Sequence, residues 1–352
     1  RRKLREFKKT IVHGITDCRK VLLSTYIERW LYTFKAAAVE NTSFDRLESV
    51  YYTHIKPTLG GFQLGNIKAV DIQTLLNQKS TEYSYTIVKM IRQILSEVFQ
   101  HAYTEGDILK NPMANVIMAK RSKFKPERKM LILEDAEVKR LEEAAREKYG
   151  TGRPLFVHGN LIVFMLHTGL RCGELLALEW SDIDFENSTV SVTKAAAVVD
   201  GKQVCKAPKT KNSRREVSIP RFLTDRLCNL MVEQTKTKES LGAYWKGNNW
   251  LFTQSDGSMM SYSTPYATFQ DAIDRYNAGK EPADQLPHIP FHGLRHTSAT
   301  LLIAAHQDVR TVSNRLGHAQ ASTTMNIYAH ALKENDRTAS NALENMLCKT
   351  GA

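Results

Sequence analysis

The sequence predicts a mainly α-helical protein of two domains, the second of which adds a small three-stranded antiparallel sheet. At 352 residues the chain is longer than a single hydrophobic core usually organises. Apolar residues recur at helical spacing through most of its length, and the spacing changes to that of strands only between residues 188 and 219. With 42% apolar and 24% charged residues, the composition is that of a globular chain and excludes one that is mainly disordered.

Four amphipathic helices make up the predicted first domain. Their apolar residues repeat every three or four positions, and Asn111-Pro112 closes the segment. We expect these helices at 22–34, 45–55, 70–78 and 85–102.

The predicted second domain is larger and begins near Leu131. Three runs in it are typical of strands, at 188–199, 202–206 and 215–219, with turns at 200–201 and 212–213. Its helices are expected at 138–148, 161–166, 224–232, 263–276, 293–304 and 311–316.

The sequence excludes membrane-spanning and disulfide-rich classes of protein. No run of about 18 apolar residues could cross a membrane, and the basic residues 1–5 are followed by charge rather than by the apolar core of a signal peptide. Because residue 1 is Arg rather than Met, we expect a piece of a longer polypeptide. The cysteines lack CxxC spacing, which excludes a zinc ribbon or disulfide framework and suits a reducing cytosol; they are Cys18, Cys172, Cys205, Cys228 and Cys348.

The net charge of +12 is concentrated in two short segments. Residues 1–20 carry eight Lys or Arg against two acidic residues, and residues 120–129 carry six against one. Such runs are often solvated tails or linkers. Two of them flanking one apolar domain favour a clamp for a polyanion, because phosphate neutralisation releases counterions and supplies affinity. A membrane surface is less favoured, since neither run continues into an amphipathic helix. Nucleic acid is therefore the expected partner.

Arg171 is the first of several cationic or nucleophilic side chains with a defined local setting. Thr168-Gly169 is expected to end one helix and Arg171 to open another, so the guanidinium would lie beside free backbone N–H groups. Its planar fork of donors suits phosphate oxygens. The alternative is a surface salt bridge between Arg171 and Glu174.

Two more groups of candidates lie further along the chain. His292 and Arg295 are three residues apart and would share one helix face. Between residues 206 and 215, a hairpin would carry Lys209 and Lys211 on a turn that can reach into a groove. Taken alone, a histidine and an arginine at this spacing would arise by chance more often than not.

A last pair follows the final predicted helix. His318 comes directly after Gly317, and Tyr328 lies ten residues later in a Thr-rich context. A lone tyrosine in such a setting usually serves packing.

Taken together, these residues resemble the signature of the tyrosine recombinases of the lambda-integrase family. Four segments in the matching order carry the resemblance: TGLRCGELLALEW, PKTKNSRREVSIP, HGLRHTSATLL and LGHAQASTTMNIYAH. The hairpin and the ten-residue His–Tyr spacing are most similar to integrases of conjugative transposons and of temperate phages of Gram-positive bacteria.

The resemblance implies a DNA strand transferase that needs no energy cofactor. Tyr328 matches the nucleophile, whose 3′-phosphotyrosyl link would conserve the energy of the phosphodiester bond. Arg171 and Arg295 match the two arginines that clamp the phosphate and offset the charge of the phosphorane. His292 matches the general base or phosphate donor, and His318 matches the position that hydrogen-bonds the scissile phosphate.

The hairpin lysines and Glu174 have less direct parts in the implied mechanism. Lys209 matches the lysine that protonates the leaving 5′-oxygen, and Lys211, one alternation away, is the alternative. Glu174 matches an acidic residue that orients a neighbour, and a purely structural role is expected for it and for His296 and His330. No metal is expected, since arginines fill the electrophilic role. DNA contacts are expected from Lys120, Arg121, Lys123, Lys125, Arg128, Lys129, Lys211 and Arg214.

The resemblance also implies a C-shaped clamp on duplex DNA, with this division of the chain. A basic connector at 1–20 is the remnant of a linker to a missing arm-binding domain. A helical, SAM-like core-binding domain at 21–115 binds DNA, and a basic linker at 116–130 leads to the catalytic domain at 131–331. The tail at 332–352 either docks onto a neighbouring protomer, which we favour, or folds back on its own core.

The implied partners are duplex attachment sites, three further copies of the chain in a synaptic tetramer, and an accessory directionality factor. No membrane is involved, and the expected location is the bacterial cytoplasm. Two alternatives stay open: a type IB topoisomerase-like enzyme that nicks and closes strands, and a non-catalytic DNA-binding regulator. The regulator is disfavoured because every catalytic position is filled. The topoisomerase is disfavoured because such enzymes normally lack the histidine at 292 and act as monomers.

Overall fold

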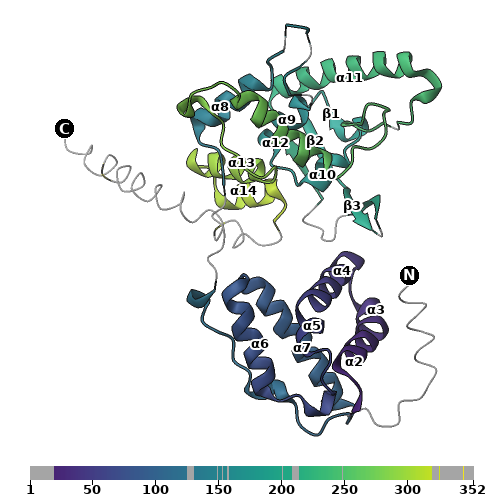
Figure 1. The fold of residues 1–352 in the computed structure, drawn as a ribbon. Helices are drawn as coiled ribbons and strands as arrows, with labels where there is room; N and C mark the ends of the chain where they lie inside the picture. The colour runs from purple at the N-terminus through teal and green to yellow at the C-terminus, as the bar shows by residue number, and fades with distance from the viewer. Residues whose placement is uncertain are drawn as a thin grey trace. The chain divides into compact units, whose positions relative to one another are not determined.

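A computed structural model describes residues 20–318, apart from 125–130, 149, 153, 157, 200, 208–213 and 248, together with Met325 and Glu344. The chain divides into two compact units, Arg1–Lys129 and Met130–Ala352. Purple and blue mark the first unit in Figure 1, and teal to yellow mark the second. Over the described residues, no helix combines the length and the apolar character needed to cross a membrane.

The first unit contains the four helical segments that the sequence predicts. Apolar residues spaced by three or four positions form its core, with Tyr26, Tyr51 and Phe99 almost fully buried. Two segments continue through a π-helical turn, so each combines three elements. The segments are α2 Leu23–Trp30 with η2 Leu31–Lys35 and α3 Ala36–Ala38; α4 Asn41–Val50 with η3 Tyr51–Ile55 and α5 Lys56–Leu59; α6 Ala69–Glu82; and α7 Tyr85–Thr104. Short 3₁₀ turns lie at Leu64–Asn66, Pro112–Asn115 and Arg121–Lys123.

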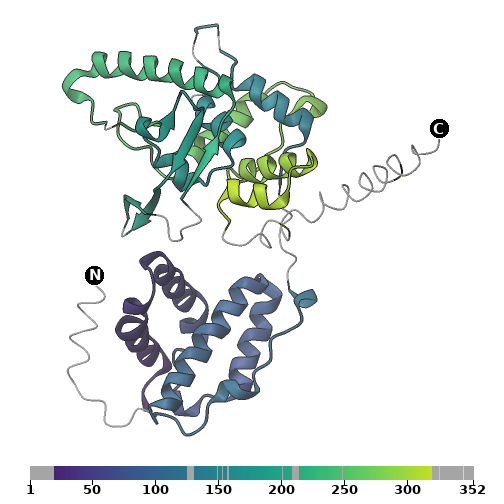
Figure 2. The same cartoon turned by 180° about the vertical axis from the view of Figure 1, so that it is seen from behind.

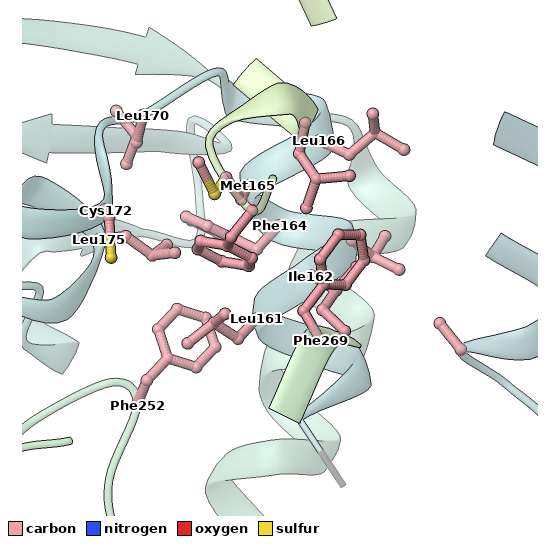
Figure 3. Packing of buried hydrophobic residues seen from close by; sticks show 14 of the residues in the cluster. Leu161, Ile162, Phe164, Met165, Leu166, Leu170, Cys172, Leu175, Phe252 and Phe269 are labelled. Carbon is pink, nitrogen blue, oxygen red and sulfur yellow. The ribbon is translucent and has the colours of Figure 1, made fainter. Parts of the chain in front are cut away.

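The helix α9 Gly159–Thr168 forms the centre of the second unit. Apolar residues occupy every position from Leu161 to Leu166, as is typical of a helix that is buried on all sides. Figure 3 shows its side chains meeting Phe252 and Phe269 from later segments. The other helices are α8 Asp135–Ala144, α10 Cys172–Leu176, α11 Arg221–Leu241, α12 Thr264–Asn277, α13 Gly293–Ala304 and α14 Val309–Leu316. The 3₁₀ turns of this unit are Trp180–Asp182, Gly242–Tyr244 and Pro282–Asp284.

The helices α13 and α14 lie side by side at one end of this unit (Figures 1 and 2). A small cluster of buried apolar residues joins them, including Ile303, Val312 and Leu316. This pairing fixes the carboxyl end of α14 close to the amino end of α10, where Arg171 lies.

The expected three-stranded antiparallel sheet is present, but its strands differ from the predicted ones. β2 Thr189–Val192 pairs with β1 Ile183–Asp184 on one side and with β5 Arg215–Ser218 on the other. β3 Ala195–Val199 and β4 Lys202–Lys206 form a separate two-stranded hairpin. The prediction of one strand at 188–199 is therefore wrong, and the predicted strand at 202–206 belongs to another sheet.

Lys194 lies at the point where the predicted strand is interrupted. Its Nζ lies 2.7 Å from Glu179 Oε1 and 3.5 Å from Asp182 Oδ2, next to the turn Trp180–Asp182. The ion pairs hold residue 194 at the point where the chain leaves one sheet for the other. The carboxylates lie earlier in the sequence, so the run of Val, Thr and Ala residues gives no sign of the break.

Several predicted helices have wrong bounds, and α8 and α11 show two physical reasons. α8 begins at Asp135 rather than at 138, because the Glu137 carboxylate accepts a hydrogen bond from the Glu134 backbone N–H at 2.7 Å and caps the first turn. It ends at Ala144, short of the predicted 148. α11 continues to Leu241, beyond the predicted 232, because the exposed residues there favour a helix without adding apolar periodicity.

Candidate active site

Arg171 opens α10, as the sequence predicts. α9 ends at Thr168 and Gly169 takes the left-handed conformation, with φ of +64°, so the chain turns before the next helix begins. Arg171 Nη1 donates to Glu174 Oε1 at 2.8 Å, and Nη2 donates to the Gly317 carbonyl at 2.8 Å. The side chain is still 39% exposed. Its orientation is thus fixed on one side while donors remain open to a ligand on the other.

Arg295 lies in the first turn of α13 and is only 1% exposed. Nη1 donates to the Gly169 carbonyl at 2.6 Å and Nη2 donates to the Leu316 carbonyl at 2.7 Å. The guanidinium therefore joins the end of α9 to the end of α14.

His292 precedes α13 and His318 follows α14. Burial and then the charges of Arg295 and Arg171 lower the pKa of His292. Burial, followed by the charges of Arg295, Arg171 and Arg215, lowers the pKa of His318 to about 4. Both imidazoles are therefore neutral near pH 7 and can each donate one hydrogen bond and accept another.

The structure brings four of the predicted site residues together. Arg171 and Arg295 bind the consecutive carbonyls of Gly317 and Leu316, directly before His318. His292 lies close enough to both arginines for their charges to lower its pKa. Two guanidinium groups and two imidazoles are thus gathered at the ends of three helices. The predicted residues Lys209, Lys211 and Tyr328 lie outside the described residues.

The sequence analysis missed Arg215 as a member of this site. Glu174 is 4% exposed, and its carboxylate accepts hydrogen bonds from Arg215 Nη1 at 3.1 Å and Nη2 at 2.8 Å. Burial by itself would raise the pKa of Glu174, but the hydrogen bonds and charges of Arg215 and Arg171 hold it below its ordinary value. Strand alternation offered the signal, because Arg215 shares the inner face of β5 with the buried Val217.

Arg315 is a half-buried cation that the sequence analysis also missed. Its Nη2 donates to the carbonyls of His167 at 2.9 Å and Ser218 at 3.0 Å. Its own carbonyl accepts a hydrogen bond from Arg215 Nε at 2.7 Å. Arg315 therefore ties α14 to α9 and β5, and so helps to hold the segment that leads into His318.

The residues expected to be structural have different surroundings. Glu174 is buried between two arginines, so its pair with Arg171 is not the surface salt bridge considered above. The His296 ring packs edge-on against His292, with centroids 4.9 Å apart, and burial lowers its pKa to about 4. His330 lies outside the described residues. Within the described part of the chain, no group of three or more His, Cys, Asp or Glu side chains could hold a metal ion.

The candidate DNA-contacting cations are only partly described. Lys120 precedes the 3₁₀ turn Arg121–Lys123 and is exposed, and the Arg121 guanidinium lies 5.0 Å from the centroid of the Tyr85 ring. Arg214 is exposed directly before β5. Lys125, Arg128 and Lys129 lie outside the described residues.

Comparison with known proteins decides the family. Residues 131–335 match the phage integrase family, and residues 22–80 match the SAM-like N-terminal domain of phage integrases. The chain belongs to the phage integrase family. A relative from Caldanaerobacter subterraneus subsp. tengcongensis, described as tyrosine recombinase XerC-like, is 29% identical over 98% of this chain and 88% of its own length.

Solved integrase structures share the fold. The Tn1549 transposon integrase in complex with transposon right end DNA matches with a TM-score of 0.72 and 23% identity, over 93% of this chain and all of that one. A lambda integrase tetramer bound to a Holliday junction matches with a TM-score of 0.59 and 21% identity, over 90% of this chain and 85% of that one. The expected resemblance and fold class are thereby confirmed, and this integrase is a tyrosine recombinase, an enzyme of site-specific DNA recombination.

Proposed function

We propose that this integrase cuts and rejoins duplex DNA at attachment sites of a mobile element, with Tyr328 as the nucleophile. One observation supports this most directly. Two guanidinium groups, Arg171 and Arg295, are held on the adjacent carbonyls of Leu316 and Gly317, only a short stretch of chain before Tyr328. Fixed donors of this kind suit a phosphate that gains negative charge as it is attacked.

The proposed reaction conserves the number of phosphodiester bonds. The phenolic oxygen of Tyr328 attacks the scissile phosphorus, and the bond from phosphorus to the 5′-oxygen breaks, leaving a 3′-phosphotyrosyl link. Lys209, or alternatively Lys211, gives the departing 5′-oxygen its proton. Attack by a 5′-hydroxyl of the partner strand reverses these steps and frees the tyrosine.

The side chains around the phosphate have distinct tasks in this proposal. Arg171 and Arg295 offset the charge of the pentacoordinate phosphorane, and one such donor contributes roughly 3–4 kcal/mol to lowering the barrier. The neutral imidazole of His318 donates a hydrogen bond to a phosphate oxygen. His292 accepts the phenolic proton or donates to the phosphate. No metal or energy cofactor takes part.

We further propose the division of labour along the chain and the assembly in which it works. The segment 21–115 binds the duplex, and the linker 116–130 joins this segment to the catalytic segment 131–331. A connector at 1–20 precedes all three. The enzyme recombines two DNA sites as a tetramer in the bacterial cytoplasm, with an accessory factor setting direction. The fold shared with the lambda integrase tetramer supports this assembly.

Tyr328→Phe tests the proposal, because it removes the hydroxyl that attacks. We expect DNA affinity to stay within about two-fold, since a neutral hydroxyl releases no counterions. On a nicked attachment-site duplex, we expect no covalent protein–DNA adduct. Tyr244→Phe is the matched control: Tyr244 is 80% exposed, and its loss should leave adduct formation intact.

The products decide between the rival functions. Joined recombinants after adduct formation support an integrase, whereas relaxation of supercoils without joining supports the topoisomerase-like alternative. An adduct that persists in Tyr328→Phe would assign the nucleophile to another residue.

A further inference from the structure

The Glu174 carboxylate is shared between two guanidinium groups that differ in exposure. Oε1 accepts from Arg171 Nη1 at 2.8 Å and from Arg215 Nη1 at 3.1 Å, and Oε2 accepts from Arg215 Nη2 at 2.8 Å. The Arg171 side chain is 39% exposed, whereas that of Arg215 is 7% exposed. One of the two cations is therefore available to a ligand, and the other is enclosed by protein.

Arg215 also contacts the end of α14 that carries His318. Its Nε donates to the Arg315 carbonyl at 2.7 Å, and its Nη1 lies 2.7 Å from where a Cβ on Gly317 would stand. The Gly317 carbonyl is in turn the second acceptor of Arg171. The Arg171 side chain donates to Glu174 and to Gly317, and both of these residues thus lie against the buried guanidinium of Arg215.

We propose that Arg215 is a positioning residue for strand cleavage, which acts by holding Glu174 and the end of α14 in the places from which they orient Arg171 toward the phosphate. The inference rests on the proposed function, since it concerns the phosphate that Arg171 binds. A buried carboxylate needs its charge matched. Without Arg215, Glu174 would draw Arg171 inward, and the Arg315 carbonyl would lose a donor.

A double-mutant cycle on adduct formation tests this role at saturating DNA in single-turnover conditions. Arg215→Met and Glu174→Gln should each slow adduct formation by about ten-fold or more, and the double variant should lie within about three-fold of the slower single variant. Arg221→Met is the matched control, because Arg221 is exposed at the start of α11 and loses the same charge. Its rate should stay within about two-fold of the unchanged enzyme.

Two results would overturn the positioning role: an unchanged rate in Arg215→Met, or losses that multiply in the double variant. Should Arg215→Met fail to fold, Arg215→Lys carries the test. Lysine keeps the charge but lacks the planar fork, so we expect a folded protein with a slowed rate. A rate equal to that of the unchanged enzyme in this variant would also overturn the proposal.

The dependence of the rate on pH separates positioning from a loss of stability. Among the described residues, the charged or titratable groups that face Glu174 are Arg171, Arg215, His292 and His318. Removing Arg215 takes away hydrogen bonds and a charge that lower the pKa of Glu174. In Arg215→Met, cleavage should therefore fall as the pH drops through the raised pKa of Glu174, and return when the pH is raised.

The Glu174→Gln/Arg215→Met variant identifies the group behind this pH dependence. Glutamine does not titrate, so the fall at low pH should vanish there. If the fall persists, a histidine causes it; if it never occurs in Arg215→Met, Arg215 does not act through Glu174. Either result contradicts the proposal.

The same assay distinguishes this inference from the proposed function. If the unchanged enzyme forms no adduct, the proposed function fails and the role of Arg215 falls with it. If adduct formation is lost in Tyr328→Phe but unchanged in Arg215→Met, the proposed function stands and only the role of Arg215 is removed.

Discussion

The buried arginines of this integrase fall into two kinds, according to what their side chains bind. Arg215 binds the Glu174 carboxylate, which matches its charge. Arg295 donates to two backbone carbonyls, which fix its orientation but carry no formal charge. The carboxylate offsets the charge of Arg215, whereas the two carbonyls orient the Arg295 guanidinium through dipoles alone. The two buried guanidinium groups are therefore held in place by different kinds of contact.

A substitution at Gly317 tests whether the packing of Arg215 against the end of α14 matters for cleavage, and it does so without removing a charge. Its φ is +66°, and a Cβ there would lie 2.7 Å from Arg215 Nη1. Gly317→Ala should lower the free energy of unfolding by about 1–2 kcal/mol through the left-handed backbone alone. It should also slow adduct formation by about ten-fold or more, because the methyl group displaces Arg215.

Gly201→Ala is the matched control for Gly317→Ala. Gly201 has a φ of +73° and no atom within 4 Å of the added Cβ, so it meets the same backbone strain without a clash. Thermal unfolding should show a loss for both variants, larger in Gly317→Ala because of the added clash, and only Gly317→Ala should lose cleavage. Equal cleavage by the two variants would argue against the close approach of Arg215.

At the scale of elements, the sequence predicted the helices whose position follows from the local spacing of apolar residues. The apolar run of α9 and the glycine that ends it were enough to place Arg171 at the start of α10. The break between β2 and β3 was not predictable in this way, because the partners of Lys194 at the break, Glu179 and Asp182, lie outside the strand run itself. The Glu174–Arg215 pair was missed for the same reason, since 41 residues separate its members.

The segment between β4 and β5, two strands that lie in different sheets and so do not form the predicted hairpin, carries the lysines whose roles stay a prediction. If Lys209 is the general acid, Lys209→Ala should block cleavage of an ordinary phosphodiester. A substrate with a 5′-bridging phosphorothiolate should restore cleavage, because a thiolate leaves without a proton. Lys211→Ala should need no such rescue and should weaken binding, with the salt slope reduced by about one unit.

The pattern of rescue identifies the residue. Rescue of Lys211→Ala but not of Lys209→Ala would transfer the acid role to Lys211. Rescue of neither variant would mean that this segment positions DNA without giving a proton.

At the scale of the whole molecule, the tail at 332–352 is proposed to join protomers. Its apolar residues recur at helical spacing, as expected of a segment that docks on a partner. Deleting 332–352 should leave cleavage of a nicked duplex by a single protomer possible, but should impair assembly on two DNA sites. Native gels should then show bound protomers without tetrameric complexes. Full assembly by the shortened protein would show that the tail folds back on its own core instead.

The near-complete enclosure of Arg295 has a consequence for the timing of hydration changes. Stripping water from a guanidinium is unfavourable, and with only 1% of Arg295 exposed most of that water is lost when the second unit folds. We therefore expect this desolvation to accompany folding rather than each round of strand exchange. If Arg295 contacts the scissile phosphate as proposed, little solvent then needs to rearrange around it while the phosphorus changes partners. Most of the dehydration of this guanidinium is thus complete in the folded second unit before DNA binds.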